Sequence, residues 1–374
     1  MELNKLREKA GGRAGEGIWL FGAAVYVISL HYNIFLFNSP SSLLTKLEWY
    51  GICAGLLAAS ALLLGKIYLL DRHDIKELLW ITALLAATGA GMLATGVRYL
   101  WRMALLACAA KGLDMRKLCR MYCCLLLALL AAGTVVFALG FAPDMTKPRD
   151  GAEIGHSWGF THPNVLAYWC MMICFSAILG FGRKVELKLG ICAVCLVLTV
   201  GVYKLTDSRA VLIAGGLAAA CCAVSFLTRK LLNKINRMPA LSVGLVLALI
   251  AVMMALTALY SPDRPWMVKL NYFFSARLAY AQSAFKTNGI TLFGMKEYPY
   301  VVDMLYAYVP IKLGILPGLG MLGLMLASVW RTAKAKQWDL LAIALVLALF
   351  STMETAMVFP IYITQLAAFA DLKE

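Results

Sequence analysis

The sequence predicts an all-α polytopic membrane protein with about twelve transmembrane helices and a large extracytoplasmic loop. Of its 374 residues, 62% are hydrophobic and only 15% are charged, and the mean hydropathy is +0.77. A soluble chain of this length needs more polar surface to cover its core. Apolar runs of roughly 20 residues recur, which is the length that a helix needs to cross about 30 Å of hydrocarbon. We therefore expect a single integral membrane domain over residues 1–374.

The apolar runs, taken in order, give the predicted spans. They lie near residues 17–36, 49–70, 78–97, 99–112, 118–141, 163–182, 187–204, 208–228, 240–260, 302–330, 338–356 and 357–370. The runs over 99–112 and 357–370 are short, so a tilted or partly re-entrant path also fits them. The run over 302–330 contains Pro310 and Pro317, which predict a kink or a break. The first run is long for a signal peptide and is expected to be retained as a helix.

Basic residues predict the orientation, because Lys and Arg are enriched in the loops on the cytoplasmic side. They occur in the N-terminal segment and in alternate loops: Lys5, Arg7, Lys9 and Arg13; Arg72 and Lys76; Lys111, Arg116, Lys117 and Arg120; Arg183, Lys184 and Lys188; Arg229, Lys230, Lys234 and Arg237; Arg331, Lys334 and Lys336. We expect both termini and these loops to be cytoplasmic. The net charge of +15 then reflects topology and contact with anionic lipid, so it calls for no nucleic acid partner. The eleven cysteines lie in apolar runs and are interpreted as small buried hydrophobic residues.

Two long loops are predicted on the extracytoplasmic side, over about 142–162 and 261–301. Long loops in a compact protein are often functional. The second is the large loop, and it combines basic residues with aromatic ones. Its middle, over about 265–287, is expected to form an amphipathic helix at the membrane interface. The aromatic residues would then be membrane anchors, an interpretation that fits them as well as a functional role does.

The segment Gly159–Asn164 gathers polar and helix-starting residues at one end of an apolar run. Pro163 suits the first turn of a helix, because its missing N–H would be unpaired there, and Thr161 or His162 would cap that helix. The polar residues Thr206–Arg209 begin the next such helix in the same way.

Helices that begin on one side present free N–H groups and positive dipole ends there. Together with Arg209 and Arg277 they would form an anion site suited to pyrophosphate. Each residue also has a simpler interpretation: Arg209 as a side chain reaching the interface, His162 as a cap alone, and Arg277 as a surface charge. Arg98 and Arg102 interrupt an apolar region, and at least one of them is expected to face a cavity.

The same residues carry a family resemblance. The run Ser157–Asn164 resembles the Gly-Phe-x-His-Pro-Asn signature of bacterial polysaccharide repeat-unit polymerases, the Wzy-type members of the O-antigen polymerase and ligase superfamily. The segment Leu205–Arg209 resembles the Ser-Arg helix start of that family, and Phe274–Leu278 resembles its Ser-x-Arg element. Further similar positions follow in order: Leu292-Phe293-Gly294, Val302-Asp303, Tyr306, Gly314-Ile315 and Glu354. The resemblance covers residues of roughly 150–360.

The resemblance implies a metal-independent glycosyltransferase with GT-C-like architecture in the bacterial cytoplasmic membrane, without a cofactor. It would join undecaprenyl-pyrophosphate-linked oligosaccharide units on the outer face, beside a flippase and a chain-length regulator. The implied catalytic residues are His162, Arg209, Arg277 and Asp303. The implied substrate-binding residues are Asn164, His156, Arg98, Tyr306 and Glu354. The arginines would stabilise the leaving group, and His162, Asp303 or Glu354 would act as general base.

One departure and several alternatives accompany this expectation. Family members commonly place an arginine a few residues before the signature, whereas this chain has His156 there, so His156 or Arg149 would supply the positive charge. A ligase would use the same donor with another acceptor. A transporter of lipid-linked oligosaccharides would also need intramembrane arginines and kinked helices. A structural scaffold would leave these arginines without a role.

Overall fold

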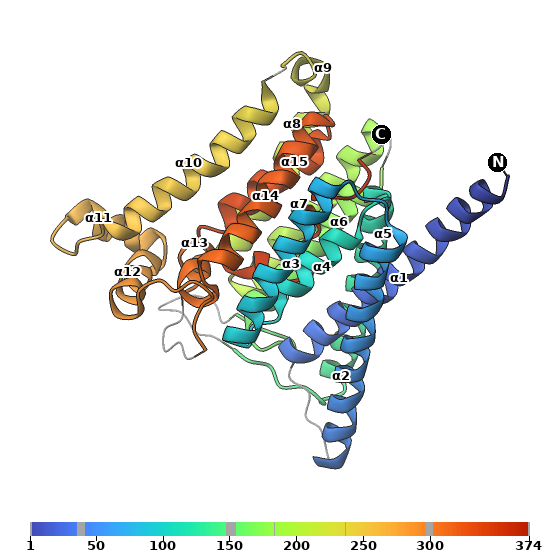
Figure 1. The fold of residues 1–374 in the computed structure, drawn as a ribbon. Coiled ribbons are helices and arrows are strands. Elements are labelled where there is room, and N and C mark those ends of the chain that lie inside the picture. The colour runs from blue at the N-terminus through green and yellow to red at the C-terminus, as the bar shows by residue number, and fades with distance from the viewer. Residues whose placement is uncertain are drawn as a thin grey trace.

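The computed structural model describes residues 2–35, 42–146, 155–182, 184–235, 237–296 and 302–372, and Figure 1 shows a bundle of helices. Within these ranges the chain contains no β-sheet, and its isolated bridges include those between Phe35 and Phe160 and between Asp114 and Asp371. The α-helices are α1 (Glu2–Ile34), α2 (Ser42–Gly65), α3 (Ile75–Thr95), α4 (Tyr99–Ala109), α5 (Met115–Ala138), α6 (Pro163–Gly180), α7 (Val185–Thr206), α8 (Arg209–Leu227), α9 (Arg229–Leu232), α10 (Met238–Ala258), α11 (Pro265–Phe273), α12 (Arg277–Asn288), α13 (Leu305–Tyr308), α14 (Ile315–Lys334) and α15 (Trp338–Phe350). Arg149, proposed above as a source of positive charge, and the end of the large loop (297–301) lie outside the described residues.

Nine of the described helices are long and apolar enough to cross a membrane, which confirms a polytopic membrane protein. The nine segments are Gly12–Ile34, Tyr50–Leu70, Ile75–Thr95, Met115–Ala138, Pro163–Gly180, Val185–Thr206, Arg209–Leu227, Met238–Ala258 and Ile315–Lys334. Two further apolar helices, α4 and α15, are shorter. Buried charges also lie within the bundle: Lys188 of α7 donates to the carboxylate of Asp339 on α15 and lies 4.3 Å from the centre of the Phe226 ring.

The run over 302–330 is broken, as its prolines predict. It consists of α13, a π-helical turn η2 (Val309–Leu313) that contains Pro310, and α14. The break falls at Gly314, whose φ is 96°. A Cβ on Gly314 would lie 2.3 Å from the backbone nitrogen of Gly294, so this close approach of two chain segments requires glycine.

The run over 357–370, for which a partly re-entrant path also fitted the sequence, forms no α-helix. It contains only the short 3₁₀ turns η3 (Ala356–Val358) and η4 (Ile363–Ala368) inside the bundle. Pro360 lacks an N–H and cannot complete a helical turn. Side chains bond the buried carbonyls that no helix satisfies. From other elements, Tyr122 donates to Pro360 at 2.7 Å, Ser328 to Thr364, and Arg331 to Ala367 at 3.1 Å and to Ala370 at 3.2 Å. Within the run itself, Gln365 donates to Met357 at 3.2 Å. Irregular backbone is tolerated at this depth because protein groups satisfy it.

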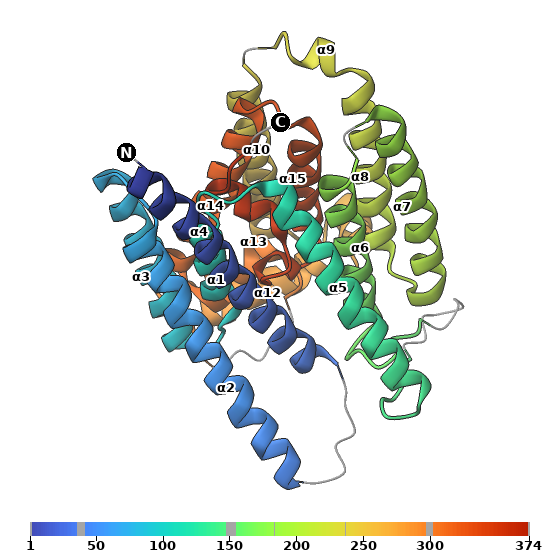
Figure 2. The same ribbon diagram turned by 90° about the vertical axis from the view of Figure 1, so that its right-hand side faces the viewer.

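We name the two ends of the bundle by residue: the His162 face, where α6 begins, and the Lys111 face, beyond the end of α4. Figures 1 and 2 show both ends of the chain near the Lys111 face, together with α9. The helices α11 and α12 lie at the other end of α10 (Figure 1). The predicted single amphipathic helix over 265–287 is therefore two helices, which turn at Ser275 and Ala276 with positive φ values of 52° and 64°.

Aromatic packing fixes the chain just before α6. Phe160 is 1% exposed, and its ring lies edge-on to the rings of His31 and Phe35, with centroids 5.5 and 5.3 Å away. The N–H of Thr161 donates to the carbonyl of Ile34 at 2.9 Å. These contacts join the end of α1 to the beginning of α6 and so fix where His162 lies.

Candidate functional site

A cavity of about 530 Å³ opens at the His162 face. Its walls come from the beginning of α6, the end of α7, the turn between α11 and α12, the segment before α13, and the segment after α15. The lining residues are His162, Pro163, Asn164, Val165, Tyr168, Thr206, Asp207, Ser275, Arg277, Tyr280, Asp303, Glu354, Thr355 and Phe359. Five of the residues predicted from sequence meet here: His162, Asn164, Arg277, Asp303 and Glu354. They come from parts of the chain that are far apart in sequence.

His162 is the N-cap of α6, and Pro163 is in its first turn, as expected. The Nδ1 atom of His162 accepts a hydrogen bond from the N–H of Asn164 at 3.1 Å. A neutral imidazole that accepts at Nδ1 carries its proton at Nε2. In that form His162 is a hydrogen-bond donor at Nε2, which disfavours it as a general base.

Arg277 lies between two carboxylates in this cavity. Its Nη2 atom is 2.9 Å from Oε1 of Glu354 and 3.8 Å from Oδ2 of Asp303. The side chains of Arg277 and Glu354 are 13% and 6% exposed, whereas that of Asp303 is 47% exposed. A side-chain hydrogen bond also joins Tyr168 to Glu354. Glu354 is therefore held by two partners, while Asp303 remains accessible from the cavity.

The turn before Arg277 has an uncommon backbone conformation. Ser275 and Ala276 both have positive φ, which costs on the order of 1–2 kcal/mol for each residue that is not glycine. Residues held in this way often cluster at functional sites. The turn places Arg277 at the first position of α12, and its Nε atom is buried without a hydrogen-bond partner in the described structure. The guanidinium thus retains a donor beyond its pairing with Glu354.

The lining combines charged and aromatic groups. Asp207, Asp303 and Glu354 supply carboxylates, and Arg277 supplies a guanidinium. Carboxylates accept hydrogen bonds from hydroxyl groups. Tyr168, Tyr280 and Phe359 add apolar ring surface against which a sugar ring can pack. The cavity can therefore bind polyhydroxylated molecules as well as an anionic group beside Arg277.

The other predicted residues lie outside this cavity. Arg209 is exposed on the first turn of α8, Arg98 is exposed before α4, and neither lines the cavity. Tyr306 is buried and donates from its hydroxyl to the carbonyl of Ala348 at 2.6 Å, so it fixes α13 against α15. Arg102, in contrast, is buried, with Nη1 3.4 Å from Oγ of Ser29. Arg209 does not line the cavity that Arg277 lines.

His156 pairs with Asp144, in the loop before α6. The Nδ1 atom of His156 lies 2.6 Å from Oδ2 of Asp144, whose Oδ1 accepts from the N–H groups of Ser157 and Trp158 at 2.8 and 3.1 Å. Partial burial raises the pKa of Asp144, but the hydrogen bonds and the nearby His156 outweigh burial and lower the pKa below its ordinary value. His156 thus orders this loop and does not line the cavity.

Sequence reasoning missed Tyr168, Thr355 and Phe359. A signal for Tyr168 was available, because it follows Asn164 by four residues and so lies on the same side of α6. No local signal distinguished Thr355 or Phe359, since they lie at the end of one apolar run (338–356) and near the start of the next (357–370).

No cluster of three or more potential ligands among His, Cys, Asp and Glu could hold a metal ion within the described ranges. Comparisons of the chain with family models, with curated proteins and with solved structures gave no match. The functional argument therefore rests on the cavity and on the residues that line it.

Proposed function

We propose that the protein is a membrane glycosyltransferase that polymerises undecaprenyl-pyrophosphate-linked oligosaccharide units on the outer face of a bacterial cytoplasmic membrane. The observation that carries this proposal is the position of Arg277 between Glu354 and Asp303, in a cavity that begins at the N-terminus of α6. One cation for a leaving group, an accessible carboxylate for a hydroxyl, and ring surfaces for sugars are present together. The resemblance in sequence points to the same chemistry.

The proposed topology has twelve crossings with GT-C-like architecture. The nine long helices, the shorter α4 and α15, and the irregular segment after α15 supply them. The His162 face then lies outside the cell and the Lys111 face inside, because the basic loops lie at the latter. A flippase and a chain-length regulator are the expected partners.

In the proposed reaction, a sugar hydroxyl of one lipid-linked unit attacks the anomeric carbon of another chain. A bond forms between that oxygen and the carbon, the bond from the carbon to pyrophosphate breaks, and undecaprenyl pyrophosphate leaves. Arg277 and the N-terminus of α6, which His162 caps, stabilise the negative charge of the leaving group. Asp303 accepts the proton of the hydroxyl, since Glu354 is held by Arg277 and Tyr168. This mechanism is independent of metal.

Asn164 and the aromatic residues of the cavity position the sugars. An O-antigen ligase would use the same donor chemistry and differ in its acceptor. Identifying the acceptor in a reconstituted reaction distinguishes the two: growth of the glycan in steps of one repeat unit supports polymerisation, whereas a single transfer to another lipid supports ligation.

Arg277→Ala and Arg264→Ala form a matched pair for testing the proposal. Arg264 belongs to the same large loop but is exposed and does not line the cavity. In the native bacterium we expect Arg277→Ala to accumulate single lipid-linked units on the outer leaflet, because polymerisation fails after export. Arg264→Ala should still make polymer. Normal polymer in Arg277→Ala cells would contradict the proposal.

A second candidate function is transport of the lipid-linked unit. It is favoured by a second cavity, of about 540 Å³, at the Lys111 face. The irregular backbone over 351–371 connects the two cavities, because its first part lines the cavity at the His162 face and its last part lines the second cavity. Transporters combine broken helices with sites that open on both sides. Under this alternative, Arg277→Ala would accumulate its lipid-linked units on the inner leaflet.

A further inference from the structure

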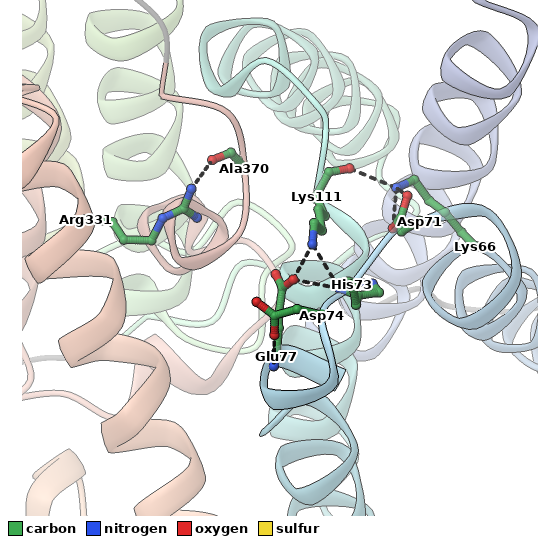
Figure 3. Close-up of polar contacts among 8 residues, drawn as sticks. All are labelled: Lys66, Asp71, His73, Asp74, Glu77, Lys111, Arg331 and Ala370. Atoms are coloured by element: carbon green, nitrogen blue, oxygen red, sulfur yellow. Dashed lines mark hydrogen bonds and ion pairs between the residues drawn. The ribbon is translucent and has the colours of Figure 1, made fainter. Parts of the chain in front are cut away.

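The cavity at the Lys111 face is separate from the site described above. It lies between the beginning of α3, the loop after α4, the second half of α14 and the chain after η4. Figure 3 shows four of its charged lining residues, Asp74, Glu77, Lys111 and Arg331, with some of their neighbours. Both signs of charge are represented: Asp74, Glu77 and Asp371 are acidic, and Lys111 and Arg331 are basic.

The basic side of the cavity is held in place before any ligand arrives. Lys66 donates from Nζ to the carbonyl of Lys111 at 3.0 Å and pairs with Asp71 at 2.7 Å, which anchors the loop after α4. The Nζ atom of Lys111 contacts Glu77 and lies 3.1 Å from Nδ1 of His73 (Figure 3). Groups fixed in this way lose little freedom on binding.

Donors remain on both basic side chains. An ammonium has three N–H donors and a guanidinium has five. Lys111 directs two towards His73 and Glu77. Arg331 donates from Nη1 to the carbonyl of Ala367 and from Nη2 to that of Ala370. The remaining donors suit a phosphate, which accepts charge-assisted hydrogen bonds from such groups.

The acidic side has a matching acceptor. Asp74 is the N-cap of α3, and its Oδ1 accepts from the N–H of Glu77 at 2.7 Å. Its exposed carboxylate can also accept from an ammonium group. Aromatic surface lies nearby, because the rings of Trp80 and Phe369 both line the cavity and their centroids are 5.5 Å apart. Aromatic rings also attract ammonium groups.

The position of the cavity indicates that a lipid headgroup supplies the phosphate and the ammonium group. Its walls α3 and α14 are apolar membrane-spanning helices. Trp80 is 38% exposed, as is common for a tryptophan at the level of the headgroups. The three acidic and two basic residues favour a headgroup that carries both signs over one that is only anionic.

We propose that this cavity binds the phosphoethanolamine headgroup of a membrane phospholipid in the leaflet at the Lys111 face. The phosphate contacts Lys111 and Arg331, and the ammonium contacts Asp74 near Trp80. The proposed lipid site is independent of the proposed glycosyltransferase activity.

Asp74→Asn and Asp114→Asn provide a matched test. Asp114 caps α5 by accepting from the N–H of Lys117 at 2.8 Å, but it does not line the cavity. Asparagine caps helices about as well as aspartate, so both variants should fold. The full chain is reconstituted in bilayers of phosphatidylethanolamine and phosphatidylglycerol, and the lipids retained after extraction are counted by native mass spectrometry. Ala327→Phe, which fills the cavity from α14, serves as a steric variant.

We expect the wild-type chain to retain phosphatidylethanolamine selectively. Asp74→Asn should weaken that retention on the order of tenfold, the value expected for loss of one charge-assisted hydrogen bond. Asp114→Asn should retain it fully, and Ala327→Phe should lose it. Equal retention by Asp74→Asn, or a preference for phosphatidylglycerol in the wild type, would overturn the proposal. Equally strong binding of soluble O-phosphoethanolamine would assign the cavity to a metabolite and also overturn it.

Discussion

Arg277 and Glu354 are 77 residues apart in the sequence, yet Nη2 of Arg277 lies 2.9 Å from Oε1 of Glu354. The pair joins the large loop to the segment that follows α15. Because both side chains are largely buried, neither charge is well solvated without the other. The pairing therefore fixes the loop over the cavity and directs the arginine into it.

This pairing predicts strongly coupled effects on stability. Arg277→Met or Glu354→Gln should each lower the apparent Tm in detergent, because removing one partner of a buried pair costs roughly 3–5 kcal/mol. The double variant should lose much less than the sum of the two single losses. Arg264→Met, in an exposed part of the same loop, should leave Tm nearly unchanged. Additive losses in the double variant would show that the two residues do not act as a pair.

A side chain at Gly159 is predicted to destabilise the fold, because the ring of Phe35 packs against this glycine. Its φ is +88°, and a Cβ there would lie 2.5 Å from Cζ of Phe35. Gly140 has a similar φ of +80° with no atom within 4 Å of a built Cβ. Gly140→Ala should therefore cost only about 1 kcal/mol for its conformation, whereas Gly159→Ala adds a clash. We expect Gly159→Ala to lower Tm clearly more than Gly140→Ala, and equal shifts would contradict the packing described for this segment.

Asp144 predicts a specific dependence of stability on pH. Its pKa is lowered in the folded protein, so its contribution is fully present above its ordinary pKa of 3.8 and is lost as the pH falls through the lower folded value. The difference in Tm between the wild type and Asp144→Asn should shrink as the pH falls below about 4. Thermal unfolding across that range measures it. A difference that grows on acidification would have the wrong sign for this account.

Much of the fold could be predicted from the sequence, and particular residues show why the rest could not. The cap of α6 at His162 and Pro163 depends only on adjacent residues, so the local sequence pattern was sufficient to predict that a helix begins there. Apolar composition marked the run over 357–370 as membrane-embedded, but its irregular backbone depends on distant donors such as Tyr122 and Arg331. Local patterns cannot reveal such partners.

The candidate site shows the same limit. Arg209 and Arg277 both follow serine-containing turns at helix starts, and no local pattern distinguishes one arginine from the other. The direction of each side chain is set by how its helix packs, and only Arg277 lines the cavity. Asp303 and Glu354 were expected at the site, but their unequal exposure, 47% against 6%, is a tertiary property that separates their proposed roles.

The most direct measurement of the central claim is polymerisation by the purified chain. The protein is reconstituted with undecaprenyl-pyrophosphate-linked oligosaccharide, and glycan length is followed on gels for the wild type, Asp303→Asn and Asp263→Asn. Asp263 is an exposed acid of the large loop outside the cavity. We predict ladders of repeat units for the wild type and Asp263→Asn, and bound but unextended units for Asp303→Asn. A wild-type chain that forms no ladder, or an Asp303→Asn variant that forms a normal one, would contradict the account.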